Sequence, residues 1–239
     1  MTKKLCILID PDKPQAYSVA KSCIEYKDLI NDYGVEVWIG TSKTNFQTIN
    51  YFTKILRDER ISEIVVFPGR LDHAFCYKNA KRIFRPILLN CTKWYMHAYV
   101  KLGKLLTSFF DFISRDKKSE DYAYITLGSN STVGKKLGSL PLEEEEIISI
   151  VKRYLKNLPK EKGIYFEAGS GSKKCVSPEV VIKSRKILPE KMEIIVGGGI
   201  NSPEEVKKFF DSGANKVVVG TYFEDHPEKI EEFIGRLYS

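Results

Sequence analysis

Short runs of apolar residues alternate with longer stretches of mixed polarity along the whole chain. The runs cover residues 5–9, 35–39, 64–67, 87–89, 123–127, 164–166, 194–196 and 217–219. Within each run the apolar residues are nearly continuous, which is typical of strands buried on both faces of a parallel sheet. The pattern therefore predicts eight parallel strands.

Most of these runs are followed by a stretch of helical character. The predicted helices are 14–33, 44–58, 92–112, 143–157, 178–187, 203–212 and 226–238. Two of them begin with Ser-Pro-Glu, at Ser177 and Ser202, where the serine caps the helix and the proline takes its first position. Strand–helix units of about 30 residues predict an α/β fold, a single-domain (β/α)8 TIM barrel over residues 1–239.

The third unit departs from this regular pattern. Only about 17 residues separate Gly69 from Ile87, and Pro86 lies directly before the predicted strand. We therefore expect the third helix to be missing or irregular.

Composition narrows the class of protein. The 239 residues are 43% hydrophobic and 29% charged, which excludes a disordered chain, and 38 Lys or Arg against 31 Asp or Glu give a net charge of +7. This balance favours polyanionic partners. The five cysteines have no zinc or redox spacing, no apolar run approaches the ~20 residues of a membrane span, and the first residues lack a signal-peptide pattern. We expect a reduced, cytoplasmic protein.

Glycines follow the last three predicted strands. They are Gly169 and Gly171, then residues 197–199, then Gly220. In a TIM barrel ligands bind at the carboxyl ends of the strands, where bare backbone N–H groups can converge on a phosphate. Tight turns also use glycine, but the repetition favours anion binding. Neither GxGxxG nor a Walker loop is present, so we expect a small phosphate.

Acidic residues follow other predicted strands. Asp10 and Asp12 come directly after the first, and Ser42 follows the second. Hard oxygen donors near a phosphate suit magnesium, so Asp10 is a candidate ligand, whereas Asp12 could instead cap the next helix. Glu167 ends the sixth strand beside the expected phosphate loop, where it could accept a proton from a substrate hydroxyl or serve as a hydrogen-bonded structural residue.

The segment from Trp94 to Phe112 is unusually aromatic and apolar for the helix after the fourth strand. It could pack in the core, form an interface of a homo-oligomer, or provide a wall for a long hydrocarbon substrate. The three histidines, His73, His97 and His226, have no ligand-like spacing, and we assign them no role.

Taken together, the strand ends resemble those of the geranylgeranylglyceryl phosphate synthase family. The matching motifs, in chain order, are LIDPDK (8–13), IGTS (39–42), FPG (67–69), LLN (88–90), YFEAGSG (165–171), VGGGI (196–200) and VGT (219–221). The YxEAGSG element is the most specific of them. The family usually has Gly-Gly-Ser/Thr where this chain has Gly40-Thr41-Ser42, and often Gly-Asn where it has Gly220-Thr221.

The resemblance implies a magnesium-dependent prenyltransferase of archaeal ether-lipid biosynthesis. It would join the geranylgeranyl group of geranylgeranyl diphosphate to the 3-hydroxyl of sn-glycerol 1-phosphate and release diphosphate. Asp10 and Ser42 would lie at the magnesium site, and Glu167 and Asp10 would be catalytic. The glycerol phosphate would be held by Tyr165, Phe166, Glu167, Ala168, Gly169, Ser170, Gly171, Gly198, Gly199, Gly220 and Thr221.

Two alternatives stay open on the sequence. The same chemistry could use a longer prenyl donor, or the chain could be another phosphate-binding barrel enzyme. A protein that binds nucleic acid would cluster its basic residues with aromatic ones, whereas here they are spread along the chain, so we expect no nucleic-acid partner. The excess lysines instead favour contact with an anionic membrane surface.

Overall fold

A computed structural model describes residues 3–41, 43–116, 118–127, 132–139, 141–157, 160–172 and 175–239. Its strands form a closed barrel in chain order, from β1 to β8, and the neighbouring strands pair in parallel. The strands are β1 (Lys4–Ile9), β2 (Glu36–Thr41), β3 (Ile64–Pro68), β4 (Arg82–Leu88), β5 (Ser119–Thr126), β6 (Gly163–Glu167), β7 (Glu193–Gly197) and β8 (Lys216–Val219). The predicted (β/α)8 fold is confirmed.

Helices separate the strands at nearly every step of the chain. They are α1 (Ala16–Glu25), α2 (Lys27–Asp32), α3 (Phe46–Asp58), α4 (Trp94–Ser114), α5 (Thr132–Leu137), α6 (Glu144–Leu155), α7 (Pro178–Ile187), α8 (Pro203–Asp211), α9 (Thr221–Asp225) and α10 (Ile230–Tyr238), with 3₁₀ turns η1 (Leu71–Lys78) and η2 (Pro227–Lys229). No helix in the described residues is long and apolar enough to cross a membrane.

The irregular third unit is confirmed, because the 3₁₀ turn η1 takes the place of the helix between β3 and β4. Strand β4 begins at Arg82, five residues before the predicted start at Ile87. The prediction missed the first part of the strand because Arg82 and Arg85 interrupt its apolar pattern. The Arg82 guanidinium is nevertheless satisfied, since it pairs with Glu36 at 3.0 Å and Glu63 at 2.7 Å. The predicted helix 14–33 is broken at Tyr26, which separates α1 from α2.

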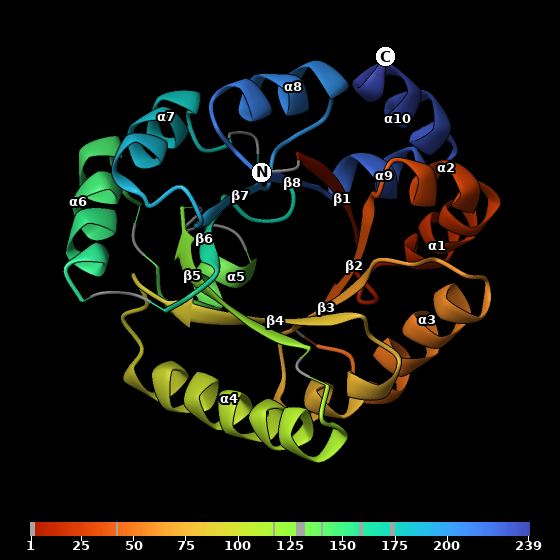
Figure 1. Cartoon of the computed structure of the whole chain (residues 1–239), viewed down its shortest axis with the longest axis horizontal. Helices are drawn as coiled ribbons and strands as arrows, with labels where there is room; N and C mark the ends of the chain where they lie inside the picture. Colours follow the sequence, from red (N-terminus) through yellow and green to blue (C-terminus); the bar gives the residue numbers. More distant parts are fainter. Residues whose placement is uncertain are drawn as a thin grey trace. The chain divides into compact units, whose positions relative to one another are not determined.

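The chain divides into two compact units. Unit 1 comprises Met1–Leu5, Pro86–Ala98 and Asp121–Thr221, and unit 2 comprises Cys6–Arg85, Tyr99–Glu120 and Tyr222–Ser239. In unit 1, β6, β7 and β8 lie side by side and α6, α7 and α8 follow one another along their outer side (Figure 1). Glu167 is in register with Gly197, so the ends of β6 and β7 are neighbours.

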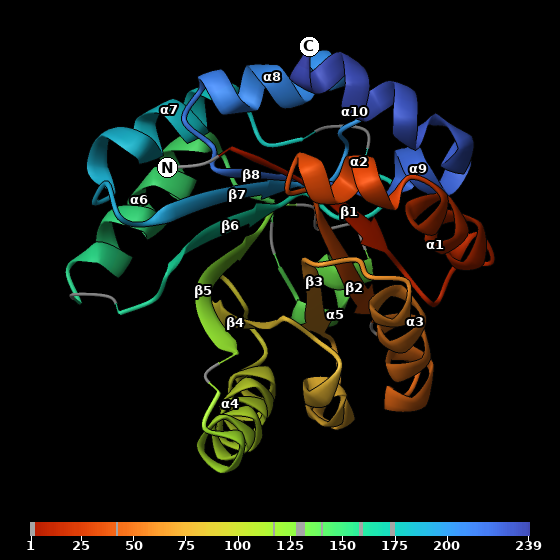
Figure 2. The same cartoon turned by 45° about the vertical axis from the view of Figure 1, so that its right-hand side comes forward.

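In unit 2, β1, β2 and β3 are neighbours, and α3 lies alongside β2 and β3 (Figure 2). The register pairs Ile9 with Ile39 and Thr41 with Pro68. The segments that follow β1 and β2 therefore leave the sheet close together. Each unit thus presents its own set of the strand-end residues that the sequence singles out.

Candidate functional site

The loops after β6 and β7 pack backbone against backbone in unit 1. Gly198 has a φ of +86°, and a Cβ on it would lie 2.6 Å from the Gly169 nitrogen. Gly169 itself has a φ of +98° and Gly199 a φ of +75°, which L side chains rarely adopt. Only glycine allows these two loops to approach so closely.

Several backbone N–H groups at these strand ends point to an unfilled role as donors. Among the residues that the structure describes, no acceptor is found for the N–H groups of Ser170, Gly198, Gly199 and Gly220. Successive N–H groups in turns with positive φ form concave anion sites. We refer to the loops 168–172, 197–200 and 220–221 as the phosphate loops. Their geometry suits a phosphate group held by backbone amides.

Thr221 ties two of the phosphate loops together. Its Oγ1 accepts a hydrogen bond from the Gly171 N–H at 3.2 Å. The asparagine usual in the resembled family is thus replaced here by a hydroxyl that contacts the loop after β6. This contact brings together Thr221 and Gly171, two of the residues that the sequence predicts to hold the glycerol phosphate.

Glu167 is the buried acid of this cluster. Its Oε1 accepts the Gly169 N–H at 2.6 Å, and its Oε2 accepts the Tyr165 hydroxyl. Burial raises the pKa of Glu167, although these two hydrogen bonds act in the opposite direction. A carboxylate whose pKa is raised and whose orientation is fixed by two donors is suited to accept a proton.

Two tyrosines support Glu167. Tyr165 lies on the same face of β6, its ring packs edge to face on Tyr124 at 5.3 Å, and a Cβ on Gly197 would collide with its hydroxyl. Burial and the charge of Glu167 together raise the pKa of Tyr124, which keeps that hydroxyl neutral. Phe166 points to the opposite face of the strand and is fully buried, so its side chain packs in the core. Its predicted contribution to a ligand site is therefore limited to its backbone.

In unit 2, Asp10 follows β1 directly. Its Oδ1 accepts the Asp12 N–H at 3.0 Å, which forms a turn typical of aspartate. Burial is the main cause that raises the pKa of Asp10, the charge of Asp12 adds to it, and Lys13 and Lys43 oppose it. Among the described residues, its Oδ2 has no hydrogen-bond partner, so one carboxylate oxygen is available to a cation.

Asp12 binds backbone N–H groups of the loop after β2. Its Oδ2 accepts the Lys43 N–H at 3.1 Å and its Oδ1 accepts the Thr44 N–H at 2.9 Å. The suggested helix cap is wrong, because Gln15 precedes α1 and no side chain caps that helix. Asp12 instead fixes the loop after β2, where the Thr41 hydroxyl also accepts from Lys43. Ser42, the second predicted metal ligand, lies outside the described residues.

Unit 2 contains two further buried polar residues to which the sequence analysis assigned no role. Glu224, on α9, is 6% exposed, and the charge of Asp10 raises its pKa further after the larger effect of burial, while Lys13 lowers it. His73 is fully buried and bridges two loops, since its Nδ1 accepts the Gly69 N–H at 3.2 Å and its Nε2 lies 2.9 Å from the Thr44 oxygen. Neither residue belongs to a local motif, so no sequence signal pointed to them.

The described residues contain no group of three or more His, Cys, Asp or Glu side chains that could enclose a metal. Magnesium commonly keeps several waters and takes only one or two carboxylates together with substrate phosphates. Asp10, with a carboxylate oxygen that is not committed and with Glu224 nearby, fits such an open site. The donor set therefore agrees with the magnesium that the sequence suggests, without a protein cage.

Comparison with known proteins assigns the family. The model of the PcrB family matches residues 1–236. The chain belongs to the PcrB family. The geranylgeranylglyceryl phosphate synthase of Methanococcus aeolicus is 30% identical over 231 residues, which cover 95% of this chain and 86% of that protein. The resemblance to the geranylgeranylglyceryl phosphate synthase family is thereby confirmed for this PcrB-family chain.

Solved structures agree with the fold of this PcrB-family barrel. The (S)-3-O-geranylgeranylglyceryl phosphate synthase of Thermoplasma acidophilum, in complex with the substrate sn-glycerol-1-phosphate, superposes with a TM-score of 0.80 at 24% identity and covers 99% of this chain and 92% of that one. The tryptophan synthase α-subunit of Pyrococcus furiosus, at 16% identity, reaches a TM-score of 0.54 and covers 99% of this chain and 96% of that one. The latter shares a barrel.

Proposed function

We propose that this protein transfers a geranylgeranyl group from geranylgeranyl diphosphate to the 3-hydroxyl of sn-glycerol 1-phosphate and releases diphosphate. This reaction forms the first ether bond of archaeal membrane phospholipids. Membership of the PcrB family and the names of its relatives support the reaction class. The observation that carries the proposal is Glu167, a buried and oriented carboxylate next to amide-lined phosphate loops.

In this proposal the phosphate loops bind glycerol phosphate through the N–H groups of Ser170, Gly198, Gly199 and Gly220. Backbone amides in fixed turns lose little freedom on binding, so they orient the phosphate and with it the glycerol chain. The 3-hydroxyl then lies against the Glu167 carboxylate. Gly169 and Tyr165 hold that carboxylate in place by their two hydrogen bonds.

Glu167 accepts the proton of the 3-hydroxyl as its oxygen bonds to C1 of the prenyl chain. The bond between C1 and the diphosphate oxygen breaks, and diphosphate departs with the electron pair. Asp10, with Glu224 and the hydroxyl of Ser42, would hold magnesium, which would supply positive charge to the leaving diphosphate. The Asp12 carboxylate positions the loop after β2 through the Lys43 and Thr44 amides.

A transfer assay tests the proposal. Purified protein with magnesium, radiolabelled glycerol 1-phosphate and prenyl diphosphates of C15 to C35 should give a solvent-extractable product, most rapidly with the C20 donor. Faster transfer from a longer donor would retain the chemistry and change the substrate. We expect Glu167→Gln to lower kcat by about 10² to 10⁴-fold because the base is lost.

Glu190→Gln is the matched control, since Glu190 is exposed and lies in the turn before β7. It should retain the activity of the unaltered protein. Absence of product with every donor would contradict the proposed reaction. Full activity of Glu167→Gln would contradict the proposed role of Glu167 as the base but would leave the proposed reaction standing. The expected homo-oligomer and cytoplasmic location stay predictions, which sedimentation and cell fractionation can check.

A further inference from the structure

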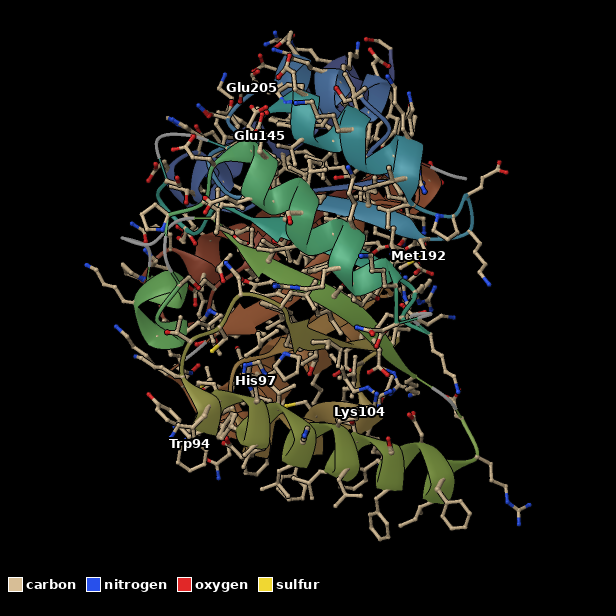
Figure 3. All side chains as sticks on the ribbon, turned by 90° about the vertical axis from the view of Figure 1, so that its left-hand side faces the viewer. Trp94, His97, Lys104, Glu145, Met192 and Glu205 are labelled. Atoms are coloured by element: carbon tan, nitrogen blue, oxygen red, sulfur yellow. The ribbon has the colours of Figure 1, made fainter. Side chains whose placement is uncertain are left out.

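Helix α4 exposes a stripe of apolar residues to solvent. Side chains at helical spacing in this stripe are strongly exposed: Leu105 is 67% exposed, Phe109 57% and Phe112 81%. Leu102 and Ile113 continue the stripe. Figure 3 shows ring side chains projecting outward from this helix, with Trp94 at its first turn. We call the stripe formed by Leu102, Leu105, Phe109, Phe112 and Ile113 the α4 outer face.

The opposite side of α4 is the one that packs within unit 2, and it does so largely through polar contacts. Arg85 donates to Thr107 at 3.3 Å and to Ser108 at 2.9 Å, and the Tyr99 hydroxyl accepts the Leu71 N–H at 2.8 Å. Thr107 is only 3% exposed. A surface helix usually turns its apolar stripe toward the core, whereas α4 has a second apolar stripe on its solvent side.

The apolar surface continues beyond the helix. Phe75, on η1, is 55% exposed and packs edge to face on Phe110 of α4 with ring centroids 5.7 Å apart. Exposed apolar patches of this kind on a folded protein usually mark an interaction surface. The α4 outer face and Phe75 therefore indicate a surface that binds a partner, and the neighbouring charged residues indicate the chemistry of that partner.

Positive charge is concentrated on the same segment. Residues 93–118 contain six Lys or Arg against two Asp, a net charge of +4 out of the +7 of the whole chain. The two acids are already engaged, since Asp111 accepts the N–H groups of Lys118 and Ser119 and Asp116 pairs with Lys118. Lys101 and Arg115 are exposed beside the apolar stripe.

We propose that the α4 outer face docks the protein on an anionic lipid bilayer. A second copy of the chain would place like charges opposite one another, whereas anionic headgroups complement Lys101 and Arg115 while the apolar side chains enter the acyl boundary. Trp94, 79% exposed at the first turn, is of the residue type that favours the membrane interface. This inference goes beyond the proposed function and needs no substrate to be tested.

Vesicle co-sedimentation of the full chain tests the docking. Unilamellar vesicles of phosphatidylcholine with about 30% phosphatidylglycerol should bind the protein at low salt, and vesicles of phosphatidylcholine alone should bind it weakly. The double variant Phe109→Gln/Phe112→Gln should lose at least about tenfold in binding, because two aromatic side chains no longer enter the bilayer. Lys101→Glu/Arg115→Glu should lose a similar amount at low salt and little at high salt.

Matched controls show whether vesicle binding depends on the α4 outer face or on the net charge and exposed apolar surface of the chain in general. Lys54→Glu/Lys207→Glu makes the same change in net charge on the exposed surfaces of α3 and α8, and Ile182→Gln removes an exposed apolar side chain from α7. Both should bind vesicles as the unaltered protein does. Circular dichroism melting shows that each variant is folded, and light scattering gives the molar mass in solution.

Three outcomes would overturn the proposal. The first is that the unaltered protein does not bind anionic vesicles, and the second is that both face variants bind them as the unaltered protein does. The third is a lower molar mass of the face variants in solution, which would assign the α4 outer face to contact with a second copy of the chain. Because no prenyl donor is present, a negative result here leaves the transfer assay untouched. Failure of the transfer assay would likewise leave vesicle binding as measured.

Discussion

At the residue scale, the chemistry of unit 1 depends on how Glu167 is held. Its two hydrogen-bond donors come from residues two positions before and two positions after it, Tyr165 and Gly169. A strand places Tyr165 and Glu167 on one face, and the glycine turn brings the Gly169 amide back to the carboxylate. The arrangement is therefore local, and the motif YFEAGSG encodes it almost completely.

Tyr165→Phe tests Tyr165 as a positioning residue. The hydroxyl stabilises the ionised carboxylate and lowers the pKa of Glu167, so its removal raises that pKa further above the ordinary value. Because the base acts in its ionised form, the acid limb of the profile of kcat/KM against pH should move to higher pH. At pH values well above the limb, activity should fall only a few-fold.

Tyr154→Phe is the matched control for this variant. The Tyr154 hydroxyl also donates to a glutamate, Glu161 at 2.8 Å, but Tyr154 lies on α6, Glu161 lies between α6 and β6, and the pair has no assigned role. The acid limb of the kcat/KM profile of Tyr154→Phe should coincide with that of the unaltered protein. An acid limb that stays in place in Tyr165→Phe would argue against control of Glu167 by this hydroxyl.

At the element scale, the phosphate loops depend on glycines that no other residue can replace. In Gly198→Ala the new Cβ would lie 2.6 Å from the Gly169 nitrogen, and the φ of +86° would be strained as well. We expect the loops after β6 and β7 to separate, the KM for glycerol 1-phosphate to rise at least about tenfold and the melting temperature to fall by about 2 to 8 °C. Steady-state kinetics and calorimetry measure the two effects.

Gly235→Ala provides the control for the loss of a glycine. Gly235 is exposed in α10, and a Cβ there would meet nothing within 4 Å. Alanine should stabilise the helix by about 1 kcal/mol and raise the melting temperature by about 2 to 4 °C, with no change in KM. A normal KM in Gly198→Ala would mean that the phosphate does not depend on this loop contact.

Prediction from sequence succeeded where structure is encoded locally. Helix α7 has the predicted bounds and α8 ends one residue early, because Ser-Pro-Glu starts are readable in the chain itself. Strand β4 was predicted too short, because the partners that make Arg82 acceptable come from Glu36 and Glu63, far away in sequence. For the same reason the roles of His73 and Asp12, whose hydrogen bonds link separate strand ends, and of Glu224, which interacts electrostatically with Asp10, could not be predicted.

At the scale of the whole molecule, the positive charge of the chain is not concentrated at the proposed substrate sites. The phosphate loops offer backbone amides and little side-chain charge, so the net charge of +7 is not needed to bind glycerol phosphate. More than half of it, +4, falls instead within residues 93–118 of the sequence. The site near Asp10 is acidic and requires a cation before it can accept a diphosphate. Binding of the two substrates should therefore differ in its dependence on metal.

Ligand-linked melting of the full chain checks this difference. Glycerol 1-phosphate at about 100 times its Kd should add about 2.7 kcal/mol and raise the melting temperature by about 5 to 10 °C, with or without a chelator, because the donors are backbone amides. A non-hydrolysable prenyl diphosphate should raise it only when magnesium is present. Asp10→Asn should lose the second shift and keep the first, since Asp10 lies outside the phosphate loops. Loss of the glycerol phosphate shift on chelation would contradict amide-based binding, and a metal-independent diphosphate shift would remove the need for a cation at Asp10.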